Sequence, residues 1–599
     1  MTRSDIDAYV VDLRRHTNDL VPIARLPPEI LLMVFKKCRA GKLQPSRLSL
    51  WQAPWITFTQ VCHHWRVVAL SAPTLWNTMV LEVRNKSLPP SEAIATWLGR
   101  TGQTPLVVDV RDSEDSLHQL SRRNQQALSD LILEQLPRIR KLDVAMAHEV
   151  PSMMQWPSSM SPCMERLSLW NRQCPAETIW DVQSLAVNFS QRFPALRKFT
   201  LAGGYQFDFT TWTLPSSLTS LMILNSVPSA SQSPSDIMNV LRRLGSLNVL
   251  LLENVLPHDA KPFVGMEPVA LPTLSSLQLG DTEYKFLLSH LVLPPSTTLN
   301  LKWGMDDLHE ESRFSTLARH LRRGRPLRSA YLMPESYCDG AMSWFEFAAW
   351  WDVQTVESME EQAEEDKADV WVVWCPGTLQ ADMVDNDLIS ILTLLVGLPL
   401  STVRSLRLGS APPLLKMHAL WCQMSKVDTL GVFGSGKSNT ARHFMQLLEE
   451  LDGGAVVFPE LRVLHVKRIN VKGSLCRLTP ILQQRQGDEE FEITLQMCYH
   501  IVSADVDALE QIALVDWDRI EQWHNCADSE SESNGDLEED GDSEPDEDEV
   551  DEEGLDESTS GNTGLVYGAY MLSVTLVAWS TSPPVCSART YSESAHRRL

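Results

Sequence analysis

The sequence predicts an α/β solenoid that follows a small all-α domain and precedes a disordered acidic segment. A short hydrophobic motif recurs from residue 136 to residue 466 in one register, and two apolar helical segments precede it. After it, residues 528–557 hold eighteen Asp or Glu and no Lys or Arg. The expected organisation is a tail or short helix at 1–23, the helical domain at 24–80, repeats at 81–523, the disordered segment at 524–563 and an extension of unknown structure at 564–599.

The repeated motif is x-P-x-Φ-x-x-Φ-x-Φ, where Φ is apolar. Its alternating end predicts a short strand with one buried face. The proline ends the preceding arm and forces an extended entry into the strand. One such unit cannot bury its own apolar face, so stacked neighbours must complete the core. Five segments obey the motif: LPRIRKLDV at 136–144, SPCMERLSL at 161–169, FPALRKFTL at 193–201, LPTLSSLQL at 271–279 and FPELRVLHV at 458–466.

The spacing of the strands is that of a known repeat class. Successive strand positions lie 22 to 32 residues apart, at Leu142, Leu167, Phe199, Leu221, Leu250, Leu277 and Leu299. This range resembles that of irregular leucine-rich repeats, each a strand with a returning helix or arm. The resemblance covers roughly residues 104–500 and implies that the strand face binds a protein. Polar residues between the apolar strand positions are the candidates for that surface: Arg166, Lys198, Gln278, Arg407 and His465.

Two apolar helices come before the repeats. Pro27 and Pro28 suit the first turn of a helix, and Glu29 suits the positive end of its dipole. The apolar residues that follow fall on one helical face, and a second such face recurs further on, before a stop at Pro73. The first set is Ile30, Leu31, Val34 and Phe35, and the second is Val61, Cys62, Trp65, Val68 and Ala69.

Together LPPEILLMVF, VCHHWR and PTLW resemble an F-box, in the form common among basidiomycete fungi, over residues 24–80. The departure lies in the long insert at residues 39–57 and in His63-His64, where a basic residue is more usual. The resemblance implies docking on a Skp-family adaptor of a cullin–RING ubiquitin ligase, while the repeats hold an unknown protein substrate. The residues it implies for docking are Leu26, Pro27, Glu29, Ile30, Leu31, Val34, Phe35, Val61, Trp65, Leu75 and Trp76.

Two other interpretations of these helices stay open. The apolar residues could pack the helical domain against the repeats, and some of them must. The chain could also be a repeat scaffold without a ligase link, whose first helices cap the array.

The stretch GVFGSGKS at 431–438 matches the phosphate-binding loop pattern G-x-x-x-x-G-K-[ST]. A plausible strand precedes it and a plausible helix follows it, and IALVD at 512–516 resembles the metal-positioning strand of such proteins. A nucleotide-dependent switch is therefore the alternative from another functional class. Its binding residues would include Gly431, Gly436, Lys437 and Ser438.

A repeat would produce the same local order. Leu430 lies 24 residues after Leu406 and 34 before Leu464, which is the place of a repeat strand. Only about ninety residues separate the motif from the acidic segment, whereas a doubly wound nucleotide-binding sheet needs about 150 or more. We therefore expect the motif to be a repeat loop, and we expect no cofactor.

Composition narrows the class of function. The 599 residues carry a formal net charge of −25, and outside 528–557 the 52 Lys and Arg and 59 Asp and Glu leave −7. This balance argues against a nucleic-acid partner, which needs a basic surface. The eleven cysteines show neither C-x-x-C nor zinc-finger spacing, so neither a metal site nor a disulfide framework is expected. No esterase or zinc-protease motif is present, so we expect an adaptor without catalytic residues.

The N-terminal segment carries charges throughout and lacks the apolar region of a secretory signal, so the expected location is the cytoplasm, the nucleus or both. The apolar stretch at 564–579 is short of the ~20 residues that span a bilayer, and no membrane partner is expected. The charged segment at 356–368 interrupts the repeats as an exposed helix or a loop. Five tryptophans flank it, and we expect them to pack in the core.

Overall fold

In the computed structural model, all of the described residues belong to one compact unit, Met1–Trp523. The acidic segment at 528–557 and the stretch at 564–579 lie outside the described residues. The structure describes residues 2–42, 54–83, 90–112, 122–146, 161–171, 180–181, 185, 188–225, 227–228, 232–256, 267–280, 283, 286–304, 311–336, 343–364, 367–375, 395–409, 418–434, 439–449, 456–485 and 490–520.

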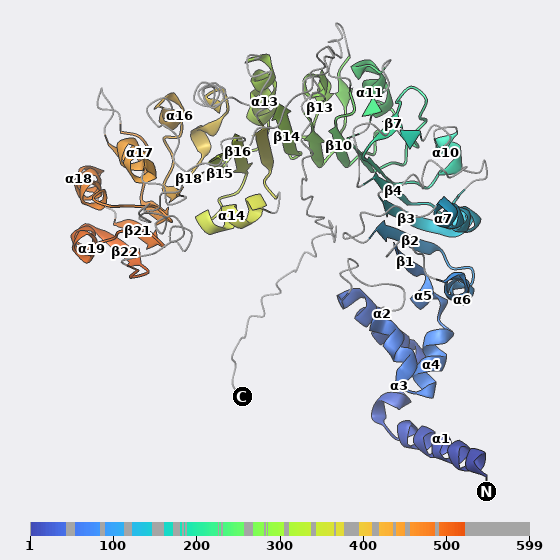
Figure 1. Cartoon of the computed structure of the whole chain (residues 1–599). Helices are drawn as coiled ribbons and strands as arrows, with labels where there is room; N and C mark the ends of the chain where they lie inside the picture. The colour runs from blue at the N-terminus through green and yellow to red at the C-terminus, as the bar shows by residue number, and fades with distance from the viewer. Residues whose placement is uncertain are drawn as a thin grey trace, which may run out of the picture. The chain divides into compact units, whose positions relative to one another are not determined.

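The N-terminal part of this unit is helical (Figure 1). Its helices are short after α2, and α5 runs almost directly into the first strand. They are α1 (Arg3–Asp19), η1 (Pro22–Arg25), α2 (Pro28–Lys42), η4 (Pro54–Thr57), α3 (Phe58–Val61), α4 (His63–Leu70) and α5 (Pro73–Trp76).

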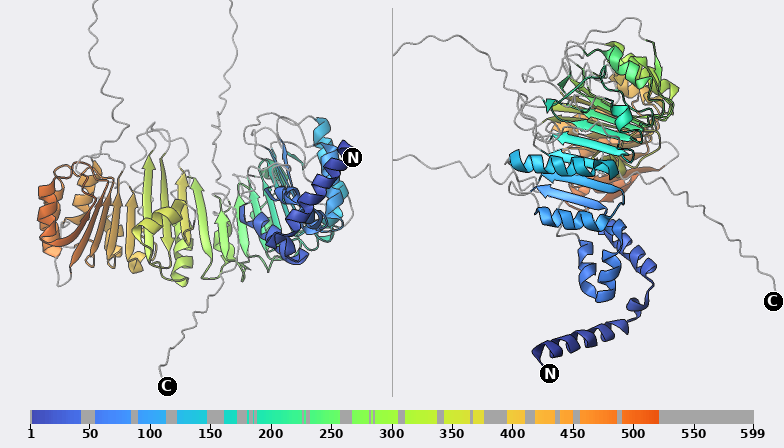
Figure 2. Two further views of the ribbon diagram at one scale, coloured as in Figure 1. Left: turned by 90° about the horizontal axis from the view of Figure 1, so that it is seen from below. Right: turned by 90° about the vertical axis from the view of Figure 1, so that its right-hand side faces the viewer.

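After these helices, the described residues form a large sheet of 17 strands, nearly all parallel, together with helices and two small sheets. Figure 2 shows the strands side by side. In spatial order they are β1 (Thr78–Val83), β2 (Leu106–Asp112), β3 (Ile139–Met146), β4 (Arg166–Asn171), β6 (Lys198–Ala202), β8 (Ser220–Leu224), β10 (Val249–Glu253), β12 (Ser276–Leu279), β14 (Thr298–Gly304), β17 (Val370–Cys375), β16 (Ser343–Trp350), β15 (Ser329–Ser336), β18 (Ser405–Gly409), β19 (Thr429–Phe433), β20 (Val463–Lys467), β21 (Phe491–Gln496) and β22 (Ala513–Trp517).

The expected strand positions form one continuous row across this sheet. Each is paired in register with the next, and all are at most 1% exposed. Each buried leucine therefore packs between its counterparts on the two neighbouring strands, which is the stacking that the repeat predicts. The row comprises Leu142, Leu167, Phe199, Leu221, Leu250, Leu277 and Leu299.

The proline-led part of the motif forms the same turn each time. In LPTL the N–H of Leu274 donates to the carbonyl of Leu271 at 3.1 Å, and in FPAL Leu196 donates to Phe193 at 3.1 Å. Proline suits the second position of such a turn because its φ is already fixed near the required value. Hydroxyl groups tie successive turns together, as where Thr297 Oγ1 donates to the carbonyl of Leu274 at 2.9 Å.

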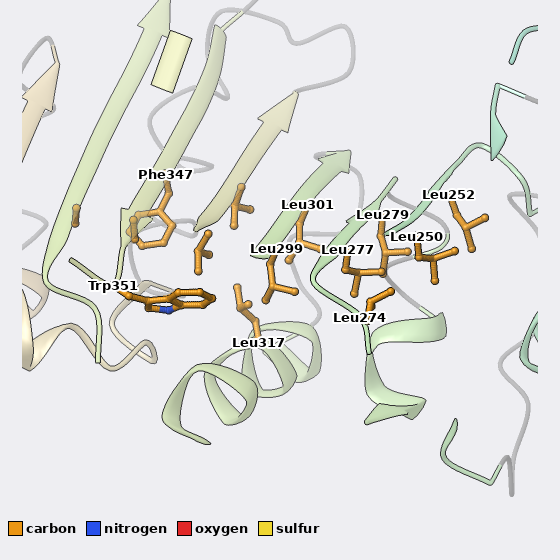
Figure 3. Packing of buried hydrophobic residues seen from close by; sticks show 14 of the residues in the cluster. Leu250, Leu252, Leu274, Leu277, Leu279, Leu299, Leu301, Leu317, Phe347 and Trp351 are labelled. Carbon is orange, nitrogen blue, oxygen red and sulfur yellow. The ribbon is translucent and has the colours of Figure 1, made fainter. Parts of the chain in front are cut away.

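Helices cover one face of the sheet. Figure 3 shows the strand leucines pointing toward α13 (Glu311–Arg323), from which Leu317 reaches into the same cluster. Burying such a side chain contributes about 1.5–3 kcal/mol, so this layer supplies much of the fold's stability. The other helices that contribute residues to this cluster include α6 (Ser91–Thr101), α7 (Arg122–Gln135), α10 (Phe189–Arg192), α11 (Pro234–Leu241), α16 (His418–Gln423), α17 (Asn439–Leu448), α18 (Leu475–Arg485) and α19 (Ser503–Glu510).

Short elements fill the remaining connections. Two small sheets and three single turns of 3₁₀ helix lie in these connections. The sheets comprise β5 (Trp180–Asp181), β7 (Tyr205–Phe207) and β9 (Val227–Pro228), and β11 (Val269–Ala270) with β13 (Leu291–Val292); the turns are η5 (Leu136–Arg138), η6 (Leu288–His290) and η9 (Leu400–Thr402).

The sheet departs from simple sequential order at one place. β14 pairs in parallel with β17 rather than with β15, and β16 lies antiparallel between β17 and β15. The chain crosses from β16 to β17 through α14 (Val356–Glu364). α14 lies on the opposite side of the strands from α13 (Figure 1). Residues 356–364 of the charged segment form a helix, which is one of the two expectations, but Val356 and Met359 in this helix are buried rather than exposed.

The tryptophans beside this segment pack inside the protein. Trp350 and Trp351 are 2% and 8% exposed, and Trp371 is half-buried. Trp371 Nε1 donates to Glu346 Oε1 at 2.6 Å, so its polar edge has a partner. The packing interpretation is confirmed for these three, and the side chains of Trp344 and Trp374 lie outside the described part of the structure.

A buried carboxylate organises the chain after β10. Glu283 is fully buried, and its Oε1 accepts the N–H groups of Val255 at 2.6 Å and Leu256 at 2.8 Å. Its Oε2 accepts the N–H of Asn254 at 3.1 Å, where the backbone is left-handed with φ 53°. Burial raises the pKa of Glu283, while the three N–H donors act in the opposite direction. One side chain thus accepts hydrogen bonds from three backbone N–H groups that lie beyond the end of β10.

We expect Glu283→Gln to destabilise this repeat by about 1–3 kcal/mol, because the amide NH₂ cannot accept the N–H that Oε2 accepts. Chemical denaturation of the full chain, followed by intrinsic fluorescence, measures the loss. Glu490→Gln, an exposed site, is the matched control and should leave the midpoint unchanged. Equal midpoints for both variants would show that the buried carboxylate contributes nothing.

Candidate functional site

The first helix after η1 starts where the sequence predicts. The N–H of Leu26 donates to the carbonyl of Ile23, closing η1, and the N–H of Leu31 donates to Pro27 at 3.0 Å. Glu29 lies in the first turn of α2. The helix thus begins at the double proline. The missing proline N–H groups cost no hydrogen bond there, because the N–H groups of the first helical turn have no partner within the helix.

Aromatic packing holds α2 against the short helices that follow. The ring of Phe35 stacks on Phe58 with centroids 4.7 Å apart and meets Trp65 edge-on at 5.2 Å. Phe35 and Leu31 are fully buried. Phe58 was not predicted to take part, although its place four residues before Cys62 puts it at the start of the second apolar segment.

The second helical segment is broken, contrary to the single face expected. Cys62 has extended φ and ψ of −155° and 171° and ends α3. Its Sγ then accepts the N–H of Trp65 at 3.5 Å, so it serves as the N-cap of α4. Because of this break, Val61 is 56% exposed while Val68 is only 7% exposed.

The structure divides the eleven residues expected to dock an adaptor into three groups: buried, half-buried and exposed. Four are buried and pack the domain, three of them fully buried and Trp76 1% exposed: Leu31, Phe35, Leu75 and Trp76. Leu26 and Trp65 are half-buried. The exposed ones are Pro27, Glu29, Ile30, Val34 and Val61.

The exposed members define an apolar surface on α2. Ile30 is 44% exposed and Val34 is 39% exposed, and Met33, which sequence analysis did not name, is 65% exposed. These three lie at i, i+3 and i+4, so they share one helical face. We call Pro27, Ile30, Met33 and Val34 the α2 surface. Exposed apolar side chains gathered on one helical face are typical of a protein-binding site.

The comparison with protein families identifies this region. Residues 23–82 match the F-box-like family model. The match covers about a tenth of the chain and agrees with the resemblance found at residues 24–80. No curated protein sequence matches the chain.

Trp76 joins the F-box-like domain to the sheet. Its Nε1 donates to the carbonyl of Ala69 in α4 at 2.9 Å, and its own carbonyl accepts from Trp97 Nε1 in α6 at 2.7 Å. The two indole rings meet edge-on at 5.0 Å, and the guanidinium of Arg100 lies 4.3 Å from the Trp76 ring centroid. Buried tryptophan with satisfied polar groups gives a joint with a fixed geometry.

Arg39 closes the same joint from α2. Its Nη1 donates to the carbonyls of Thr74 at 3.0 Å and Leu75 at 3.1 Å, which end α5. Burial lowers the pKa of Arg39. The helix that carries the α2 surface is thereby bonded to the residues that enter β1.

The second candidate site is the sheet face away from α13, which we call the helix-free face. Arg166, Lys198 and Gln278 lie on it and are exposed or half-buried, as expected for a binding surface. Arg407 and His465 lie on it too, but α14 covers Arg407. Arg407 is 3% exposed, and its Nη1 donates to the carbonyl of Val356 at 2.9 Å.

α14 packs tightly on this part of the face. Val356 and Met359 lie in a cluster with Tyr331, Trp350 and Phe433 that is separate from the main core. The guanidinium carbon of Arg407 lies 3.6 Å from the ring centroid of Phe433. His465 Nδ1 lies 3.9 Å from Glu357 Oε1 on α14. The expectation that Arg407 offers a free binding surface is therefore wrong for this structure.

The segment GVFGSGKS is only partly described. Gly431 lies inside β19, which pairs on both sides with the parallel strands β18 and β20. A Cβ on Gly431 would lie 2.4 Å from Val356 Cγ1, so this glycine has a packing role beneath α14. Gly436, Lys437 and Ser438 lie outside the described residues. The strand at 512–516 falls in β22 and is separated from β19 by β20 and β21.

The part of the chain that the structure describes contains neither a metal-ligand cluster nor a membrane-spanning helix. Among those residues no group of three or more His, Cys, Asp or Glu could hold a metal ion. No helix within the same residues is long and apolar enough to cross a membrane.

We expect Gly431→Ala to displace α14, because the added methyl overlaps Val356 and overpacking costs about 1–3 kcal/mol. Hydrogen exchange in residues 356–364 should become faster, and the unfolding midpoint should fall. Gly245→Ala is the matched control, since a Cβ there meets nothing within 4 Å. Unchanged exchange in α14 would contradict the packing role of Gly431.

Proposed function

We propose that this protein is a substrate-recognition adaptor of an SCF-type ubiquitin ligase, acting in the cytoplasm or nucleus. The F-box-like domain would dock a Skp-family adaptor, which links it to a cullin. The repeats, a solenoid of irregular leucine-rich type in this proposal, would hold a protein substrate. The observation that carries the proposal is the F-box-like match at residues 23–82 together with the exposed α2 surface inside it.

Burial decides which residues make contact in this proposal. Pro27, Ile30 and Val34 can meet a partner directly, since each is exposed. Leu31 and Phe35 act indirectly, because they fix α2 on Phe58 and Trp65. This division supports a docking function over simple packing: a helix needed only for packing has no reason to expose three apolar side chains on one face.

The joint at Trp76 supports the second half of the proposal. An adaptor works by holding its substrate at a set position relative to the enzyme that acts on it. The bonds from Trp97 to Trp76 and from Arg39 to Leu75 connect the F-box-like domain with the start of the sheet. A substrate on the sheet would then be placed with respect to the docked ligase.

We expect the double variant Ile30→Ala, Val34→Ala to bind a Skp-family adaptor at least tenfold more weakly, because truncating central apolar contacts costs about 1–2 kcal/mol each. Binding is measured with the purified full chain by titration calorimetry. Since both side chains are exposed, the unfolding midpoint should stay within the wild-type range.

The matched control is Val292→Ala, Val502→Ala, which truncates two exposed valines outside the F-box-like domain and should bind normally. Phe35→Ala separates folding from contact: it should lower stability by about 3–5 kcal/mol and lose binding through unfolding of the domain. No adaptor binding by the folded wild-type chain would sink the proposal, leaving the scaffold interpretation.

A further inference from the structure

α14 shows what the helix-free face binds within its own chain. This helix, VESMEEQAE, places two apolar residues, Val356 and Met359, in the face. Its acidic side chains include Glu357, which is 56% exposed and lies 3.9 Å from His465. The backbone carbonyl of Val356 accepts from Arg407. The bound segment is thus acidic with apolar anchors, and the face supplies aromatic rings and a cation.

Another part of the same face offers similar chemistry without α14 on it. Lys141, Arg166 and Lys198 are paired in register on the adjacent strands β3, β4 and β6. They therefore form a row of three cations at the strand spacing of about 4.8 Å. We call them the basic row. Three cations side by side are unusual for this chain, whose formal net charge is −25.

Two cations of the basic row have no acidic partner among the described residues. Among the described residues, no carboxylate lies within 4 Å of Lys141 or Lys198. Arg166, the third cation, already has partners: its Nε lies 3.0 Å from Asp143 Oδ1 and 3.2 Å from Ser168 Oγ. Its side chain is nevertheless 42% exposed. Solvent-accessible lysines that no described carboxylate pairs with can each meet a carboxylate of a partner, which would make the two surfaces complementary in charge.

Apolar side chains lie on the same face, two and four residues beyond the basic row along the strands. Trp170 is four residues beyond Arg166 on β4, so it points to the same side of the sheet. Met222 and Leu224 on β8 share that side, in register with Thr200 and Ala202. All three are half-buried and so remain accessible. This part of the face thus combines cations with one aromatic and two other apolar side chains, as does the part that holds α14 with Arg407 and Phe433.

We propose that the helix-free face of β3, β4, β6 and β8 binds an acidic segment of a partner protein that carries an apolar anchor. The basic row pairs with its carboxylates, and Trp170 and Met222 contact the anchor. This inference rests on the proposed function in one respect: it takes the partner to be the substrate. The part of the face at β15–β20 is excluded from this site because α14 occupies it.

The test uses the full chain and a fluorescein-labelled ten-residue peptide with six Glu and two Leu, read by fluorescence anisotropy at physiological salt. The same peptide with Gln in place of every Glu is the ligand control. We expect wild type to bind the Glu peptide at least tenfold more tightly than the Gln peptide. Lys141→Glu, Lys198→Glu should lose at least tenfold in affinity for the Glu peptide, and the Gln peptide should be little affected.

The matched protein control is Lys426→Glu, Lys472→Glu, which makes the same charge change at two exposed lysines elsewhere. Equal loss of affinity in this control would overturn the proposal, since only net charge would then matter. No binding of the Glu peptide by wild type, or tighter binding of polyuridylate than of the peptide, would overturn it as well.

Adaptor binding measured on the same variants separates this inference from the proposed function. The Lys141→Glu, Lys198→Glu variant should bind a Skp-family adaptor normally, because neither lysine belongs to the F-box-like domain. If wild type binds the peptide but no adaptor, the ligase role fails while the acidic-segment site stands. If it binds the adaptor but not the peptide, the inference fails alone.

Discussion

The fold depends on one constraint: each strand must bury its apolar side chains in register with its neighbours. Leu250 packs between Leu221 and Leu277, and the same relation repeats along the sheet. A parallel strand cannot satisfy this requirement by itself, so the chain returns through an arm and lays the next strand alongside. The proline-led turn makes every return alike. Even the inverted order of β17, β16 and β15 preserves the row, since Leu299 still meets Val370 and Ala330 still meets Leu406.

The same constraint leaves two surfaces for function. Helices take one face of the sheet because the strand leucines point there, so the opposite face is free to bind other segments. α14 occupies part of that face, and the basic row lies on another part. At the N-terminal end, Leu31 and Phe35 are used for packing, which leaves Ile30 and Val34 outward on the same helix. In α2 and in the strands alike, one side packs in the core and the other faces away from it. Trp76 connects the F-box-like domain with the sheet.

Sequence patterns predicted where the strands lie, but not which distant segments pack against them. The motif located Leu142 to Leu299, because alternation and turn chemistry are local properties of the chain. The burial of Arg407 could not be predicted, because it depends on α14, which lies 51 residues away in sequence. The strand order at β15–β17 likewise depends on long-range pairing. Cys62 looked like one more apolar position, yet its extended backbone makes it a cap. The sequence alone could not show which side chains of α2 are buried and which are exposed, because this depends on where Phe58 and Trp65 lie.

Hydrogen exchange of the full chain, with and without a Skp-family adaptor, tests the central claim most directly. The account predicts slower exchange in the described parts of the F-box-like domain, residues 23–42 and 54–82, strongest in the first turns of α2. It predicts no change in the strands from β10 to β22. Unchanged exchange in α2, or protection confined to the sheet, would contradict the claim that the exposed face of α2 is where the ligase docks.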